Sequence, residues 1–240
     1  MEDVDHTVSG YLVDYATCLL FTCLAATLLR RQGWGLPALV QATMAVAYLM
    51  GSLGHHVFAN RAITDQCANT WLYMAWAIAY PCGSVSNLAW LFYCKRGKMT
   101  YIIWLLVACH VAANAFVVTG CVWCVATVTH YDGITDECPV DGIGTRCDAT
   151  VRVGEAMCFA CWFVTIAYAA SLRKGNLANW ISVLALIFGP VQILFVYTLL
   201  PSGGAALSEA LYTAVTYKTA CCISQISIFY LSDRKAGKVK

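Results

Sequence analysis

Polar residues divide the sequence into seven apolar stretches, each long enough to cross a lipid bilayer as a helix. A hydrocarbon core about 30 Å thick requires roughly 20 residues per helical crossing. The stretches cover residues 10–29, 36–58, 70–93, 101–128, 153–172, 180–200 and 206–231. Hydrophobic residues make up 60% of the 240 residues and charged residues only 12%, which excludes a soluble enzyme or a nucleic-acid-binding protein. We therefore predict one all-α domain, residues 1–240, that forms a seven-helix bundle embedded in the lipid bilayer.

Basic residues lie mainly on one side of this predicted bundle. Eleven of the 15 Lys and Arg residues fall in the connections after the first, third and fifth stretches and in the tail, residues 232–240. Only three, Arg61, Arg146 and Arg152, fall in the other connections. Because cytoplasmic loops carry the excess of positive charge, we predict an external N-terminus, a cytoplasmic C-terminus and an external loop at residues 130–152. We expect the protein in the cell membrane.

The 14 cysteines do not form the pattern of a small secreted disulfide scaffold. Eleven lie in or beside apolar stretches, where we expect most of them to pack as small apolar side chains. The CxxC pairs at 121–124 and 158–161 have zinc-ligand spacing, but their place on apolar helices favours packing, and we predict no metal site. In the external loop, a disulfide between Cys138 and Cys147 is compatible with an oxidising compartment, and the sequence leaves this pairing open.

Ionisable residues inside the predicted helices are few, and each costs roughly 3 kcal/mol at mid-helix, so each is a candidate functional residue. The candidates for gating or proton relay are Asp14, His55, His110, Glu155 and Glu209. His110 fits a simple hydrogen bond to a neighbouring helix equally well. The three carboxylates lie near the outer ends of their helices, where partial solvation also accounts for them.

Lys218 is the deepest charge in the predicted bundle. It lies about twelve residues, or roughly 18 Å, below the external end of the stretch 206–231. This is too deep for its side chain to reach either membrane surface comfortably. Such a lysine needs a counter-ion or covalent conversion to a less polar imine. Its position therefore fits a structural ion pair, a Schiff-base lysine that holds an aldehyde cofactor, or a cation in a substrate or proton path.

Three motifs resemble the microbial (type 1) rhodopsins. Residues 47–54 (AYLMGSLG) resemble the Tyr-Leu…Leu-Gly run of that family's second helix, and residues 73–81 (YMAWAIAYP) are similar to its Tyr-x-Asp-Trp-x-x-Thr-x-Pro signature. Residues 189–191 (GPV) resemble the Tyr-Pro-Val that closes the retinal pocket. Lys218 follows this proline by 28 residues, close to the family's spacing to its retinal lysine.

The resemblance implies a seven-helix retinal protein without enzymatic activity. Retinal would be bound as a Schiff base to Lys218, with Trp76 stacked on one face of the polyene. The other residues of the implied retinal site are Tyr73, Tyr80, Pro81, Pro190 and Tyr217. The implied function is that of a photoreceptor, acting either as a light-gated channel for ions or as a sensor, and a dimer or trimer is compatible with it.

Two departures from the family pattern argue against one function of the family, outward proton pumping. Ala75 stands where the family has its aspartate counter-ion, and Ala214 stands where it has the second aspartate. Proton pumping needs groups of matched pKa within hydrogen-bond reach of the imine, so an outward proton pump is disfavoured. We expect a neutral Schiff base that absorbs in the near ultraviolet, unless a bound anion or Asp14, Glu155 or Glu209 supplies a negative charge.

Two alternatives remain open. The first is a rhodopsin scaffold without photochemistry, of the chaperone or stress type, which the presence of Lys218 disfavours. The second is a membrane hydrolase built on Ser52, His55 and His56. The helix 206–231 offers no histidine to complete the zinc shell of such a hydrolase, and zinc needs three or four ligands.

Overall fold

The computed structural model describes residues 8–54, 56, 70–95, 99–129 and 143–172, together with 219, 222–223 and 226–230. The regular elements are the helices α1 (Val8–Gln32), α2 (Leu36–Leu53), α4 (Thr70–Cys94), α5 (Tyr101–Thr129) and α6 (Ile143–Ser171). Short helical pieces follow between residues 219 and 230, and this described part of the chain contains no strand. The all-α class is thereby confirmed. The stretch 180–200 and most of 206–231 lie outside the described residues.

The helix bounds follow the apolar stretches closely, with one exception. Four of the five helices start or end within a few residues of the positions that the sequence predicts. The fifth, α6, begins at Ile143, ten residues before the apolar run, so the last part of the predicted loop 130–152 is helical instead. The backbone hydrogen bonds of a helix form within the helix itself, in water as well as in lipid. Polar residues in the sequence can therefore end an apolar stretch without ending the helix.

Glycine and proline set the tight connection between α1 and α2. Gly33 has a φ of 72°, a left-handed conformation that glycine adopts without strain. Its N–H bonds the carbonyl of Leu29 at 3.0 Å and closes the last turn of α1. Pro37 then occupies the first turn of α2. Backbone N–H groups in this turn have no acceptor within the helix, so the lack of an N–H in proline costs no helical hydrogen bond. The two helices are therefore antiparallel neighbours.

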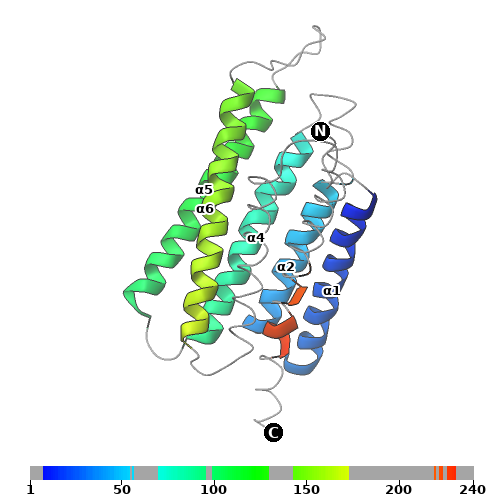
Figure 1. Ribbon diagram of the computed structural model, residues 1–240, viewed down its shortest axis with the longest axis vertical. Coiled ribbons are helices and arrows are strands. Elements are labelled where there is room, and N and C mark those ends of the chain that lie inside the picture. Colours follow the sequence, from blue (N-terminus) through cyan, green and yellow to red (C-terminus); the bar gives the residue numbers. More distant parts are fainter. Residues whose placement is uncertain are drawn as a thin grey trace, which may run out of the picture.

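The five helices lie side by side, with α4 near the middle of the bundle (Figure 1). Helix α4 packs against α2 on one side and against α5 and α6 on the other, whereas α1 packs against α2. Pro81 lies inside α4 without ending it. Because α4 contacts three other helices, a residue on it can join both halves of the described bundle.

The bundle buries polar side chains and exposes apolar ones. The buried polar residues are Asp14, Thr17, Gln41, Ser52, Ser84, Ser86, His110 and Thr165. Large apolar side chains point outward instead, among them Leu19, Trp104, Val111 and Phe116. Large exposed apolar surfaces mark contact with a membrane or a partner. Helices α1, α2, α5 and α6 are also long and apolar enough to cross a bilayer, which indicates an integral membrane protein.

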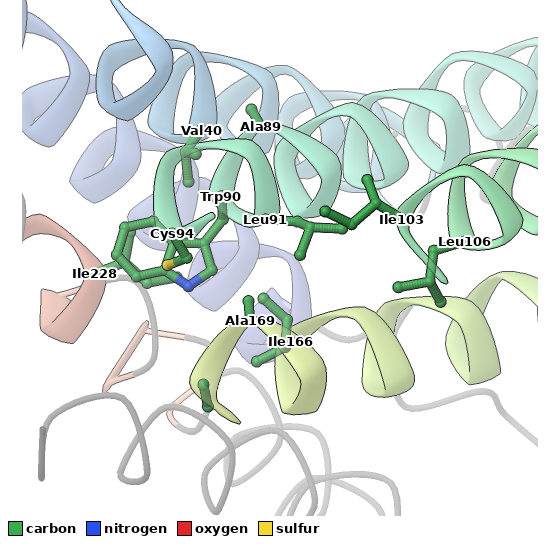
Figure 2. Close-up of a cluster of buried hydrophobic side chains, with 11 residues drawn as sticks. Val40, Ala89, Trp90, Leu91, Cys94, Ile103, Leu106, Ile166, Ala169 and Ile228 are labelled. Atoms are coloured by element: carbon green, nitrogen blue, oxygen red, sulfur yellow. The ribbon is translucent and has the colours of Figure 1, made fainter. Parts of the chain in front are cut away.

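A cluster of buried apolar side chains closes one end of the bundle (Figure 2). Trp90, Leu91 and Cys94 from the end of α4 lie among side chains of α2, α5 and α6. Ile228, from the last described helical piece, is buried against this cluster. Ile228 therefore anchors the last described helical piece to the bundle, whereas Ile223, Ile226 and Tyr230 remain exposed.

Cys124, near the end of α5, forms a disulfide bond. Cys94, Cys121 and Cys158 form no disulfide bond and are buried in apolar clusters. The prediction that most cysteines pack as small apolar residues is confirmed for these three, and Cys124 is buried in one of the same clusters although it is disulfide-bonded. Cys138 lies outside the described residues, as does the side chain of Cys147, so their pairing stays untested.

Candidate functional site

Ser84 joins three helices through one hydroxyl group. Its Oγ accepts a hydrogen bond from Nδ2 of Asn114 on α5 at 2.7 Å and another from Nε1 of Trp162 on α6 at 2.8 Å. Ser84 itself lies on α4 and is buried. Buried donors and acceptors between helices have few other hydrogen-bond partners, so such bonds are rarely exchanged for others. Ser84 therefore fixes the positions of α5 and α6 relative to α4.

Asn114 extends this arrangement along α5 and α6. Its Nδ2 also donates to the backbone carbonyl of His110 at 2.7 Å, and its Oδ1 accepts a weak bond from the thiol of Cys158 at 3.8 Å. We call Ser84, Asn114, Cys158 and Trp162 the central polar network. The three contacts of the Asn114 amide group and the bond from Trp162 to Ser84 all lie within the bundle, so the network is a structural unit of its interior.

His110 forms a second contact between α5 and α6. Its Nε2 lies 2.9 Å from the hydroxyl oxygen of Thr165, and both residues are buried. The predicted hydrogen bond to a neighbouring helix is therefore confirmed. Its Nδ1 has no hydrogen-bond partner among the described residues. The role of His110 as a gate or proton relay stays a prediction.

The predicted aromatic wall lies on the face of α4 that meets α5 and α6. The half-buried rings of Tyr73 and Trp76 pack edge to face, with 5.8 Å between their centroids. Tyr80 is stacked on Trp162, also at 5.8 Å and with only 23° between the ring planes. Together with the half-buried Pro81, these rings form an uncharged wall. They fit the apolar chain of a retinal but supply no negative charge for an imine.

The neighbouring face of α4 is buried and lacks any carboxylate. Ala75, at the position where a rhodopsin carries its counter-ion, is 3% exposed. Three turns further on, the hydroxyl of Ser86 donates to the backbone carbonyl of Val40 on α2 at 3.0 Å. Helix α4 contains no aspartate or glutamate at all. A negative charge near a retinal imine must therefore come from another helix.

A second polar group lies near the start of α1, and we call it the α1 cluster. The Tyr15 hydroxyl lies 3.1 Å from Nδ1 of His56, which follows α2, and the two rings meet edge to face. The thiol of Cys222 donates to the hydroxyl of Thr17 at 3.7 Å. Asp14, which directly precedes Tyr15 on α1, is only 3% exposed. The expectation that Asp14 is partly solvated is therefore wrong, because the bundle covers it.

Other predicted site residues are less informative or lie outside the described part. Glu155 on α6 is half-buried. Ser52 is buried, and its hydroxyl donates to the carbonyl of Tyr48 on its own helix at 2.6 Å. Among the described residues, no group of three His, Cys, Asp or Glu side chains is placed to hold a metal ion. The predicted site residues outside the described part are His55, Pro190, Glu209, Tyr217 and Lys218.

The central polar network was not predicted from the sequence. Its members are polar or aromatic residues within long apolar stretches, and several share a helical face. Tyr80 and Ser84 are four residues apart, as are His110 and Asn114, and Cys158 and Trp162. Residues four apart lie on one face of a helix. A search for polar residues at this spacing could therefore have found the faces that meet at the network.

No protein-family model, curated protein or solved structure matches the chain. The fold and the site therefore define it as an α-helical integral membrane protein with a polar interior. Any further statement about its function rests on its own residues.

Replacing Ser84 with alanine is expected to lower the free energy of unfolding by about 1–3 kcal/mol, because two donors in the interior lose their acceptor. The measurement is the unfolding midpoint of the purified protein in a detergent titration. Ser171→Ala is the matched control, since Ser171 is exposed and its hydroxyl bonds only the carbonyl of Tyr168 on its own helix. Equal midpoints for both variants would show that the network does not hold the helices together.

Proposed function

We propose that the protein is a retinal-binding membrane photoreceptor of the microbial rhodopsin type, acting as a light-gated ion channel or as a sensor. The observation that carries the proposal is the packing of the helical residues after Lys218. Cys222 contacts α1, and Ile228 is buried among α2, α4 and α6. Lys218 itself lies outside the described residues, and we propose that it belongs to the same packed segment, where an ammonium group would have little water.

The described side chains support this proposal through their chemistry. Trp76 and Tyr73 offer a wall of aromatic rings, and Ala75 leaves the adjacent buried face of α4 without charge. When bound, retinal supplies the light absorption and isomerisation that no protein side chain provides. The side chains exclude water from the polyene and hold it between the helices. A change in its shape would shift the balance between two packings of the bundle.

The disulfide of Cys124 supports the proposed orientation. Cys124 lies five residues before the end of α5, at the same end of the bundle as the start of α1 in Figure 1. Disulfide bonds persist in oxidising compartments. An external N-terminus puts the end of α5 outside the cell, as this bond requires. We propose seven helices in total, with 180–200 and 206–231 as the last two.

Expression with all-trans-retinal tests the proposal. The wild-type chain is expected to give a pigment with a bound-retinal absorption band, whereas Lys218→Ala gives none, because the amine that forms the imine is missing. Lys240→Ala, in the tail, is the control and keeps the pigment. If the wild-type chain forms no pigment, the photoreceptor proposal is wrong and a scaffold without photochemistry is favoured.

Whole-cell recording under illumination then separates the two outputs. A light-dependent current that disappears in Lys218→Ala identifies a channel, and exchange of the bath ions identifies what it conducts. A pigment that produces no current identifies a sensor. The recording is informative only after the pigment has been observed, so the two experiments are done in that order.

A further inference from the structure

Five helix ends meet at the end of the bundle that is closed by the buried cluster of Figure 2. The cluster contains Val40 from the start of α2, Cys94 from the end of α4, Ile103 from the start of α5 and Ala170 from the end of α6. Helix α1 also ends here, because the short connection 33–35 joins it directly to α2 (Figure 1). We call this the basic end of the bundle, after the charged residues described next.

The charged side chains described at the basic end are all positive. Arg30 and Arg31 lie in the last turn of α1, and both are exposed. Lys95 directly follows α4 and is half-buried. Helices α2, α4 and α5 contain no acidic residue, and the acidic residues of α1 and α6 lie in the halves of those helices that are farther from the basic end. The described surface at this end therefore attracts anions.

Large aromatic rings are exposed beside these charges. Trp34, in the connection between α1 and α2, is 79% exposed, and Tyr101, the first residue of α5, is 80% exposed. Trp104, one turn further along α5, and Tyr230, in the last described helical piece, are exposed as well. Such rings are most stable at the boundary between hydrocarbon and water. Their exposure therefore indicates that lipid headgroups surround the basic end.

We propose that the basic end is a binding surface for anionic phospholipids of the surrounding bilayer. The headgroup phosphate accepts charge-assisted hydrogen bonds from Arg30 and Arg31, and the acyl chains lie beside the ring of Trp34. A headgroup with a net negative charge is favoured over phosphatidylcholine, whose choline cation offsets the phosphate charge. Each basic residue near an anionic bilayer surface strengthens the attachment about fivefold.

The opposite end of the bundle differs in its charge pattern. Arg152, near the start of α6, is preceded four residues earlier by Asp148 and followed three residues later by Glu155. Residues at these spacings are neighbours on a helix surface, so the positive charge of Arg152 is offset by acidic residues nearby. We therefore expect a preference for anionic lipid at the basic end only.

Quenching of tryptophan fluorescence by brominated lipids tests the proposal with the full chain. Nanodiscs of phosphatidylcholine receive a small, increasing fraction of either brominated phosphatidylglycerol or brominated phosphatidylcholine. The wild type is expected to prefer phosphatidylglycerol, and Arg30→Gln combined with Arg31→Gln is expected to lower this preference at least fivefold. Arg146→Gln with Arg152→Gln removes the same charge from the first part of α6 and should leave the preference unchanged. Equal quenching by both lipids in the wild type, or an unchanged preference in the Arg30 and Arg31 variant, would overturn the proposal.

Two further measurements locate the lipid and identify its source. Trp34→Phe is expected to remove part of the quenching that is specific to phosphatidylglycerol, whereas Trp123→Phe, near the other end of α5, should retain it. In detergent, phosphatidylglycerol is expected to raise the melting temperature by several degrees, and inorganic phosphate at the same concentration should not. An equal rise with inorganic phosphate would show a site for free anions instead and would reject a lipid surface. None of these measurements needs retinal, so their outcome is independent of the proposed function.

Discussion

Replacement of Gly154 with leucine is expected to cost about 3 kcal/mol or more and to leave little folded protein. A Cβ atom at this position would lie 2.7 Å from both the backbone nitrogen and the Cγ2 of Val117 on α5. Backbone atoms in a helix cannot move aside separately, so α5 and α6 would have to part. Small residues at such crossings allow the close packing that holds helices together in lipid.

Detergent unfolding of the purified protein measures this effect, together with the monodisperse fraction in size-exclusion chromatography. Gly51→Ala is a matched control, because Gly51 lies inside α2 and a Cβ there would meet nothing within 4 Å. That variant is expected to be as stable as the wild type or up to about 1 kcal/mol more stable, since alanine favours helix. A Gly154→Leu protein with a wild-type midpoint would show that α5 and α6 do not pack at this crossing.

Gly120 shows that the close approach of α5 and α6 extends over more than one turn. A Cβ at Gly120 would lie 2.9 Å from Cγ2 of Val151 and 3.0 Å from its backbone nitrogen. Gly120 on α5 packs against Val151 on α6, and Gly154 on α6 packs against Val117 on α5. His110 and Thr165 bond further along the same interface. Helices α5 and α6 are therefore packed closely at several points along their interface.

The sequence predicted the helices well because a membrane helix is defined by a local property. About twenty apolar residues bounded by polar ones are enough to predict such a helix. The observed bounds of α4 and α5 each differ from the predicted bounds by a single residue at one end. The start of α6 at Ile143 was missed because hydropathy marks the edge of the hydrocarbon, whereas helical hydrogen bonding continues beyond it. The described residues do not test the predicted count of seven helices, because they exclude the stretch 180–200 and most of 206–231.

Partners across helices could be predicted only in part. Tyr73, Trp76 and Pro81 could be grouped from the sequence because they form a motif within one helix, whereas their role in a retinal site stays a prediction. The partner of His110, Thr165, lies 55 residues away, and no local pattern indicates which polar residue meets which. The burial of Asp14 was missed for the same reason. Its position near a helix end indicates water, but a neighbouring helix covers it.

Replacement of Gly83 with leucine is expected to disrupt the contact between α4 and α6. A Cβ at Gly83 would lie 2.6 Å from Cζ2 of Trp162. The indole ring has no free space to yield, because Ser84 holds its N–H at 2.8 Å and Tyr80 is stacked on its face. The added side chain must therefore break both contacts. We expect a loss of about 2–3 kcal/mol in the free energy of unfolding.

A double-variant cycle separates this contact from a general loss of helix packing. Trp162→Ala alone is expected to destabilise the protein by about 3 kcal/mol or more, as the removal of a large interior ring does. With the ring absent, a leucine at position 83 meets space instead of a clash, so the double variant should lose clearly less stability than the sum of the single variants. If the losses of stability of the two single variants simply add in the double variant, the leucine at position 83 does not act through Trp162. Because Trp162 also supports Tyr80, a pigment formed by the Gly83→Leu variant should have a shifted band if the aromatic wall lines the retinal site.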